Sequence, residues 1–89
     1  MSVRVQLSGQ MVVFAGTPVV EVDPAESVHT LLEELVRDVP ALREALFESD
    51  GTSRPTTLVA INGQQVQDLA RTPVPDGSEV LLLMPMAGG

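Results

Sequence analysis

The chain has 89 residues, a formal net charge of −7 and no cysteine, and 44% of its residues are apolar. This length and composition fit one globular domain, and the lack of thiols excludes disulfide frameworks, thiolate metal sites and catalytic cysteines. Negative charge and only two aromatic residues disfavour nucleic acid as a partner, because phosphate would be repelled. No apolar run reaches the roughly 18 residues needed to span a membrane, so we expect a cytoplasmic protein without membrane contact.

The first part of the chain predicts two strands. Val3–Leu7 alternates apolar and polar residues, as a half-buried strand does. Val19–Val22 predicts a second strand, with Val20 and Val22 on one face. Between them, residues 8–18 contain the apolar run Met11–Ala15, which could extend a hairpin or form a packed loop. The structure of this segment stays open at the level of sequence.

One long helix follows the second strand. Its apolar positions have the spacing of a single buried stripe: Val28, Leu31, Leu32, Leu35, Val36 and Val39. Ser27 is the expected N-cap, and Pro40 ends the helix because the residue before a proline avoids helical geometry. Leu42–Phe47 predicts a short second helix with Leu42, Leu46 and Phe47 directed inward.

The last part of the chain predicts three more strands. Thr57–Ile61 leads directly into Asn62-Gly63, the strongest short hairpin signal, and Gln64–Val66 returns as the partner strand. A turn at Pro75-Asp76-Gly77 precedes the final strand, Ser78–Met84. Its continuous apolar run is typical of a central strand buried on both faces, and we expect it to lie beside the first strand.

A hairpin cannot bury its apolar face alone, so the long helix must cover the sheet. The expected fold is therefore α+β: a β-grasp, or ubiquitin-like, domain over residues 1–85. Its small mixed sheet has four to five strands, with one main helix packed across it. Residues 86–89 are expected to form a flexible tail that ends in Gly-Gly.

Side-chain chemistry gives no candidate active site. The carboxylates are scattered over turns and the outer helix face, and His29 is the only histidine, predicted at a solvated surface position. No nucleophile has a base close to it in the pattern, no phosphate-binding loop is present, and no metal ligand set stands out. We therefore expect a protein that is not itself an enzyme.

The remaining candidate is the C-terminus. Glycines at positions 88 and 89 have no Cβ atoms, so the backbone can enter a narrow channel that larger residues would block. The reactive group would then be the α-carboxylate of Gly89. A carboxylate is inert until it is activated, so activation must come from a partner that binds ATP.

These features resemble the MoaD/ThiS family of sulfur carriers. The similarity spans nearly the whole chain and is most specific at two motifs: the turn and strand Asp76-Gly77-Ser78-Glu79-Val80, and the ending Pro85-Met86-Ala87-Gly88-Gly89. The resemblance implies a protein that carries no cofactor and acts as a covalent co-substrate. A ubiquitin-activating-like adenylyltransferase, which holds ATP and Mg, would attach AMP to Gly89. A sulfur donor would then convert the adenylate to a thiocarboxylate.

The resemblance leaves the sulfur acceptor open. The stretch from Leu42 to Ile61 is similar to cysteine-biosynthesis carriers and to larger molybdopterin synthase subunits. Of the two, an acceptor similar to cysteine synthase, or one for a related sulfur-containing metabolite, is slightly favoured. The alternative within the family is the small subunit of molybdopterin synthase. The alternative of another class is a ubiquitin-like protein modifier or interaction module, in which Gly89 would join a target lysine.

Two sets of residues are candidates for contact with partner enzymes. The first surrounds the terminus and comprises Leu82, Met84, Met86, Ala87 and Gly88, since methionine adapts to varied surfaces. The second is acidic and would steer the chain toward basic patches: Glu33, Glu34 and Glu79.

Overall fold

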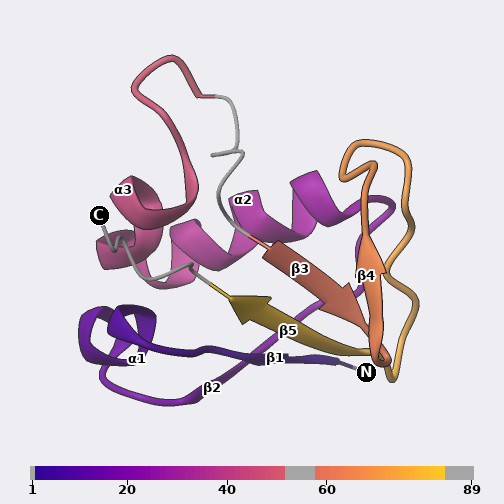
Figure 1. Ribbon diagram of the computed structural model, residues 1–89, viewed down its shortest axis with the longest axis horizontal. Coiled ribbons are helices and arrows are strands. Elements are labelled where there is room, and N and C mark those ends of the chain that lie inside the picture. Colours follow the sequence, from indigo (N-terminus) through magenta and orange to yellow (C-terminus); the bar gives the residue numbers. More distant parts are fainter. Residues whose placement is uncertain (1, 52–57, 84–89) are drawn as a thin grey trace.

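A five-stranded sheet in the order β2-β1-β5-β3-β4 forms the framework of the computed structural model, which describes residues 2–51 and 58–83 (Figure 1). The strands are β1 (Val3–Gln6), β2 (Val19–Val22), β3 (Leu58–Ile61), β4 (Gln64–Val66) and β5 (Glu79–Leu83). The helices are α1 (Gln10–Ala15), α2 (Val28–Asp38), the 3-10 turn η1 (Pro40–Leu42) and α3 (Arg43–Leu46). The predicted boundary between a domain and a tail at residue 85 lies outside the described residues.

The strand pairings make β5 the centre of the sheet. It runs parallel to β1, with Val5 opposite Val80, and antiparallel to β3, with Val59 opposite Leu82. The two outer pairs, β1 with β2 and β3 with β4, are antiparallel hairpin-type pairs. The predicted mixed sheet with its last strand beside the first is confirmed.

Helix α2 covers one face of the sheet, as its apolar stripe predicts (Figure 1). The side chain of Ser27 accepts a hydrogen bond from the backbone N–H of Thr30 at 3.1 Å, which confirms the N-cap. The core between helix and sheet is aliphatic, and its fully buried larger side chains include Val3, Val5, Leu31, Leu32, Leu35, Val59 and Leu82. The three inward positions predicted between residues 42 and 47 are also buried.

The opposite face of the sheet corrects one prediction about β5. Its burial alternates, with Val80 and Leu82 buried but Leu83 39% exposed. No described helix covers this second face, so a strand at the centre of the sheet is still half-open. The continuous apolar run arises from hydrophobic residues on both faces and does not require burial on both.

Residues 8–18 form neither a hairpin extension nor a packed loop, because they contain α1. Met11 is fully buried, and Ala15, one turn later, packs against the core. Gly16 ends the helix in the left-handed conformation, with φ of 75°, and its N–H donates to the carbonyl of Val12 at 2.8 Å. One buried and one partly buried side chain, spaced four residues apart, therefore hold this short helix in place.

The predicted Asn62-Gly63 hairpin is confirmed. Ile61 pairs with Gln64, and the two residues between them have φ values of 50° and 86°. The side-chain carbonyl of Asn62 also accepts the backbone N–H of Glu79 at 3.0 Å. This hydrogen bond joins the turn to the first residue of β5, the strand that leads toward the C-terminus.

Candidate functional site

Most of the predicted site lies outside the described residues: Met84, Met86, Ala87, Gly88 and Gly89. The structure does describe the strand that leads to them. At its end, the carbonyl of Leu82 accepts a hydrogen bond from the hydroxyl of Ser8 at 2.8 Å, and Leu83 pairs with Leu58 on β3. The last described residues of β5 are therefore held from both sides.

Leu82 itself is a core residue, which corrects its predicted role in partner contact. Its side chain is 0% exposed and faces α2, on the same side of the sheet as Val59 and Val80. The side chain of Leu82 therefore offers no surface to a partner. Its contribution is to anchor β5 in the core.

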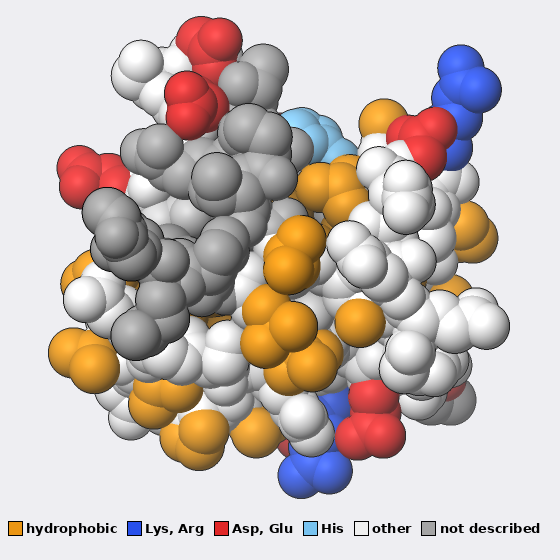
Figure 2. All heavy atoms as spheres, in the orientation of Figure 1, with side chains coloured by type: hydrophobic (Ala, Val, Ile, Leu, Met, Phe, Trp, Pro, Cys, Tyr) orange, Lys and Arg blue, Asp and Glu red, His pale blue; other side chains and the backbone are white. Residues whose placement is uncertain are grey.

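The neighbours of Leu82 supply the exposed apolar surface at this position. The strand pairing places Leu58, Ala60, Leu81 and Leu83 together on the face that α2 does not cover. Figure 2 shows hydrophobic side chains gathered over β3 and β5 on this side of the molecule. Leu58 is 40% exposed. The sequence predicts that successive residues of β5 alternate between the two faces of the sheet. Only the pairing of the strands shows that Leu83 belongs to the exposed face.

The three acidic candidates differ in their surroundings. On β1, Arg4 pairs with Glu79 of β5 on one side and with Glu21 of β2 on the other. A cation therefore separates these two carboxylates on the outer face of the sheet. Glu33 is exposed and approaches His29, with 3.7 Å between Nε2 and Oε2. One carboxylate oxygen of Glu34 is buried and has no hydrogen-bond partner among the described residues. Glu33 and Glu79 are therefore exposed, whereas Glu34 is partly buried.

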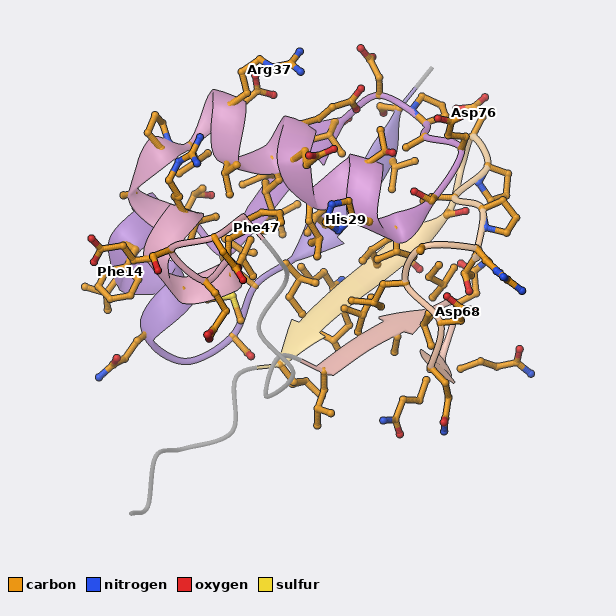
Figure 3. The ribbon with its side chains drawn as sticks, turned by 90° about the horizontal axis from the view of Figure 1, so that it is seen from above. Phe14, His29, Arg37, Phe47, Asp68 and Asp76 are labelled. Atoms are coloured by element: carbon orange, nitrogen blue, oxygen red, sulfur yellow. The ribbon has the colours of Figure 1, made fainter. Side chains whose placement is uncertain are left out.

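His29 is half-buried rather than fully solvated. Its ring meets the edge of Phe47 in a T-shaped arrangement with 5.7 Å between the centroids (Figure 3), and its backbone N–H donates to the carbonyl of Leu69. These contacts give His29 a packing role at the start of α2.

The described residues hold no group of three potential metal ligands. None of the helices in this part of the chain is long and apolar enough to cross a bilayer. A shallow hollow of about 350 Å³ lies between α2 and α3 and is lined by Val36, Arg37 and Phe47, among others. It is open to solvent and brings together no nucleophile with a base.

Comparison with solved structures gives matches that span the whole chain. The structure of SAMP1 from Haloferax volcanii is similar with a TM-score of 0.87 and 30% identity over 100% of both chains. SAMP1, the small archaeal modifier protein 1 from Methanosarcina acetivorans, matches with a TM-score of 0.87 and 27% identity, over 99% of this chain and 96% of that one.

A chain in the BexX/CysO complex of Amycolatopsis orientalis has a TM-score of 0.81 at 20% identity, over 98% and 99% of the two chains. At that identity the likeness shows the fold alone. No curated protein matches the sequence. The model of the ThiS family, however, matches residues 5–89, which is nearly the whole chain. With the β-grasp fold and the near full-length likeness to SAMP1, this match shows that the chain belongs to the ThiS family of ubiquitin-fold sulfur carriers.

Proposed function

We propose that the chain carries sulfur as a thiocarboxylate on Gly89 and donates it to a biosynthetic enzyme that makes cysteine or a related sulfur-containing metabolite. The observation that carries the proposal is the family match, which runs through the Gly-Gly ending to residue 89. The central position of β5 supports it, because the strand that leads to the terminus is paired on both sides.

The chemistry divides between the chain and its partners. An adenylyltransferase that binds ATP and Mg joins the Gly89 carboxylate to AMP and releases pyrophosphate. Sulfide then attacks the acyl carbon, AMP leaves with the C–O bond electrons, and the product is a thiocarboxylate. Both steps conserve oxidation state when sulfide is the donor. The carrier needs no cysteine for this sequence, and it has none.

Intact-mass measurement tests this proposal. The chain is incubated with ATP, Mg, sulfide and the adenylyltransferase of its own host. Exchange of one oxygen for sulfur adds about 16 Da. A variant with one alanine added after Gly89 is the control, since it moves the carboxylate away from the activating atoms. Loss of the shift in the control supports the proposal, and an equal shift in both proteins contradicts it.

A second candidate is a protein modifier, in which Gly89 forms an isopeptide bond with a lysine of another protein. It is favoured by one observation: the two structures named as small archaeal modifier protein 1 match at 28% and 27% identity, above the 20% of the CysO complex. All five basic residues of this chain are arginine, so its own side chains offer no lysine for chain-to-chain linkage. Conjugates of the chain recovered from its host, with its C-terminal segment joined through Gly89 to target lysines, would support this candidate.

A further inference from the structure

The β1–β2 connection has an unusual surface for so acidic a protein. No charged residue occurs from Val5 to Val20, although 19% of the chain is charged. Within this segment α1 presents Val13, 77% exposed, and Phe14, 45% exposed. We call Val13 and Phe14 together the α1 surface. Val13 and Phe14 are neighbours in the chain, and exposed apolar side chains on an uncharged surface are a common feature of protein contact sites.

The α1 surface is a fixed part of the molecule. Met11 is fully buried beneath the helix, and α1 packs against η1. Before the helix, the N–H of Leu7 donates to the carbonyl of Pro18 at 2.8 Å, which closes the segment at its base. The exposed pair is therefore presented by an anchored element, as a binding surface requires.

The α1 surface also lies at the end of the molecule where β5 finishes. Strands β1 and β5 are parallel, and α1 follows β1, so α1 is placed beside the C-terminal end of β5. The hydrogen bond from Ser8 to the carbonyl of Leu82 ties the two together. Figure 3 shows Phe14 directed outward at this end, opposite the end that carries Asp68 and Asp76.

The length of chain beyond β5 limits where a partner can bind. Six residues separate Leu83 from Gly89, and six residues reach at most about 20 Å. An enzyme that acts on Gly89 must therefore bring its active-site entrance close to this end of the domain. A stable interface covers about 800 Å² on each partner. The two shorter extents of the molecule are 26 and 24 Å, so such an interface spans the whole end, α1 included.

We infer that the α1 surface is a docking site for the adenylyltransferase that activates Gly89. The enzyme would contact the α1 surface through an uncharged, apolar rim beside the channel that the C-terminus enters. This inference rests on the proposed function. Docking through Val13 and Phe14 would hold the carboxylate near the ATP-binding site while the glycines enter. The contact is made before the chemistry, so its loss raises the KM for the carrier more than it lowers kcat.

The test compares Val13→Asp with Ala70→Asp in ATP–pyrophosphate exchange by the host adenylyltransferase. Both substitutions add one negative charge at an exposed position. Ala70 lies in a loop whose residues Leu69 and Thr72 accept hydrogen bonds from the N-terminal end of α2. Helix α1 packs against η1, which follows the C-terminal end of α2, so Ala70 is far from the α1 surface. We expect Val13→Asp to raise the KM for the carrier at least tenfold with little change in kcat, and Ala70→Asp to leave both unchanged. Val13→Ser, which adds no charge, is expected to give a smaller rise in KM.

The outcomes separate the two proposals. If the unaltered chain supports no exchange, the proposed function fails. If it supports exchange and Val13→Asp matches Ala70→Asp, only the docking inference is overturned. A wild-type dimer that Val13→Asp converts to a monomer, with KM unchanged, would overturn it too, because a second copy would then occupy the surface. Equal thermal midpoints of the variants show that changes in KM do not come from unfolding.

Discussion

Leu82 and Leu83 are neighbours in the chain with opposite surroundings, and the difference gives a first prediction. Leu82 is wholly buried, whereas Leu83 is 39% exposed on the open face. We expect Leu82→Ala to lower the free energy of unfolding by about 2–5 kcal/mol, because it leaves a cavity in the core. Leu83→Ala should lower it by less than about 1 kcal/mol. Urea denaturation of both variants checks this, and equal losses would contradict the assigned register of β5.

The hairpin between β3 and β4 gives a second prediction. Gly63 has φ of 86°, a region that side chains with a Cβ rarely adopt. Gly63→Ala should lower the free energy of unfolding by about 1–2 kcal/mol, although open space surrounds the position. Gln65→Ala, an exposed change on the adjacent strand, is the matched control and should have little effect. A Gly63→Ala variant as stable as the control in urea denaturation would contradict the backbone assignment of this turn.

At the scale of single residues, the sequence predicts backbone conformation better than the face of the sheet on which a side chain lies. Asn62-Gly63 and Ser27 were assigned correctly because each role depends on local backbone chemistry. The side of the sheet on which Leu82 lies depends on pairing with β1 and β3, which are distant in sequence. In a continuous apolar run both alternating sets are hydrophobic, so composition cannot tell the buried set from the exposed one.

At the scale of elements, the N-cap of α2 gives a third prediction. The hydroxyl of Ser27 accepts the N–H of Thr30, one of the helix-start amides that has no partner within the helix. Ser27→Ala should lower the free energy of unfolding by about 1 kcal/mol, and Ser27→Gly by only a few tenths. Thermal or urea unfolding of the pair measures the difference. If the two variants lost the same stability, the cap would not be the source of the effect.

The helices α2 and α1 show why some elements are predictable and others are not. Helix α2 has five apolar residues in a regular stripe, a cap and a proline beyond its end, so every local signal agrees. Helix α1 has only six residues, includes two β-branched valines and exposes part of its apolar content. Its formation depends on Met11 fitting the core and on Gly16 ending the turn, and these are tertiary effects.

At the scale of the whole molecule, the net charge of −7 gives a fourth prediction. If the adenylyltransferase offers a basic patch, attraction at long range should speed encounter with the carrier. We expect the association rate constant to fall about tenfold or more between roughly 0.01 M and 1 M salt, since the screening length shortens from about 30 Å to 3 Å. Stopped-flow mixing measures this constant. A rate that is unchanged across this range would rule out steering and leave the charge a role in solubility.

The sheet and the helix that covers it could be predicted from the order of strands and helix, because few arrangements let one helix cover a mixed sheet of this size. The proposed reactive group was found from the Gly-Gly ending and the family resemblance, while the described residues add the strand that leads to it. The α1 surface could not be found from sequence. The exposure of Val13 and Phe14 follows from how α1 sits on the core, and the pattern of the run Met11–Ala15 does not reveal it.

The central claim concerns Gly89, and it is tested most directly by the intact mass of the chain purified from its own host, with fragmentation to locate any change. The account predicts a population about 16 Da heavier than the sequence mass, with the added mass confined to the C-terminal Gly88-Gly89 fragment. A chain found only at its unmodified mass in cells that contain an active adenylyltransferase, or found only joined to lysines of other proteins, would contradict it.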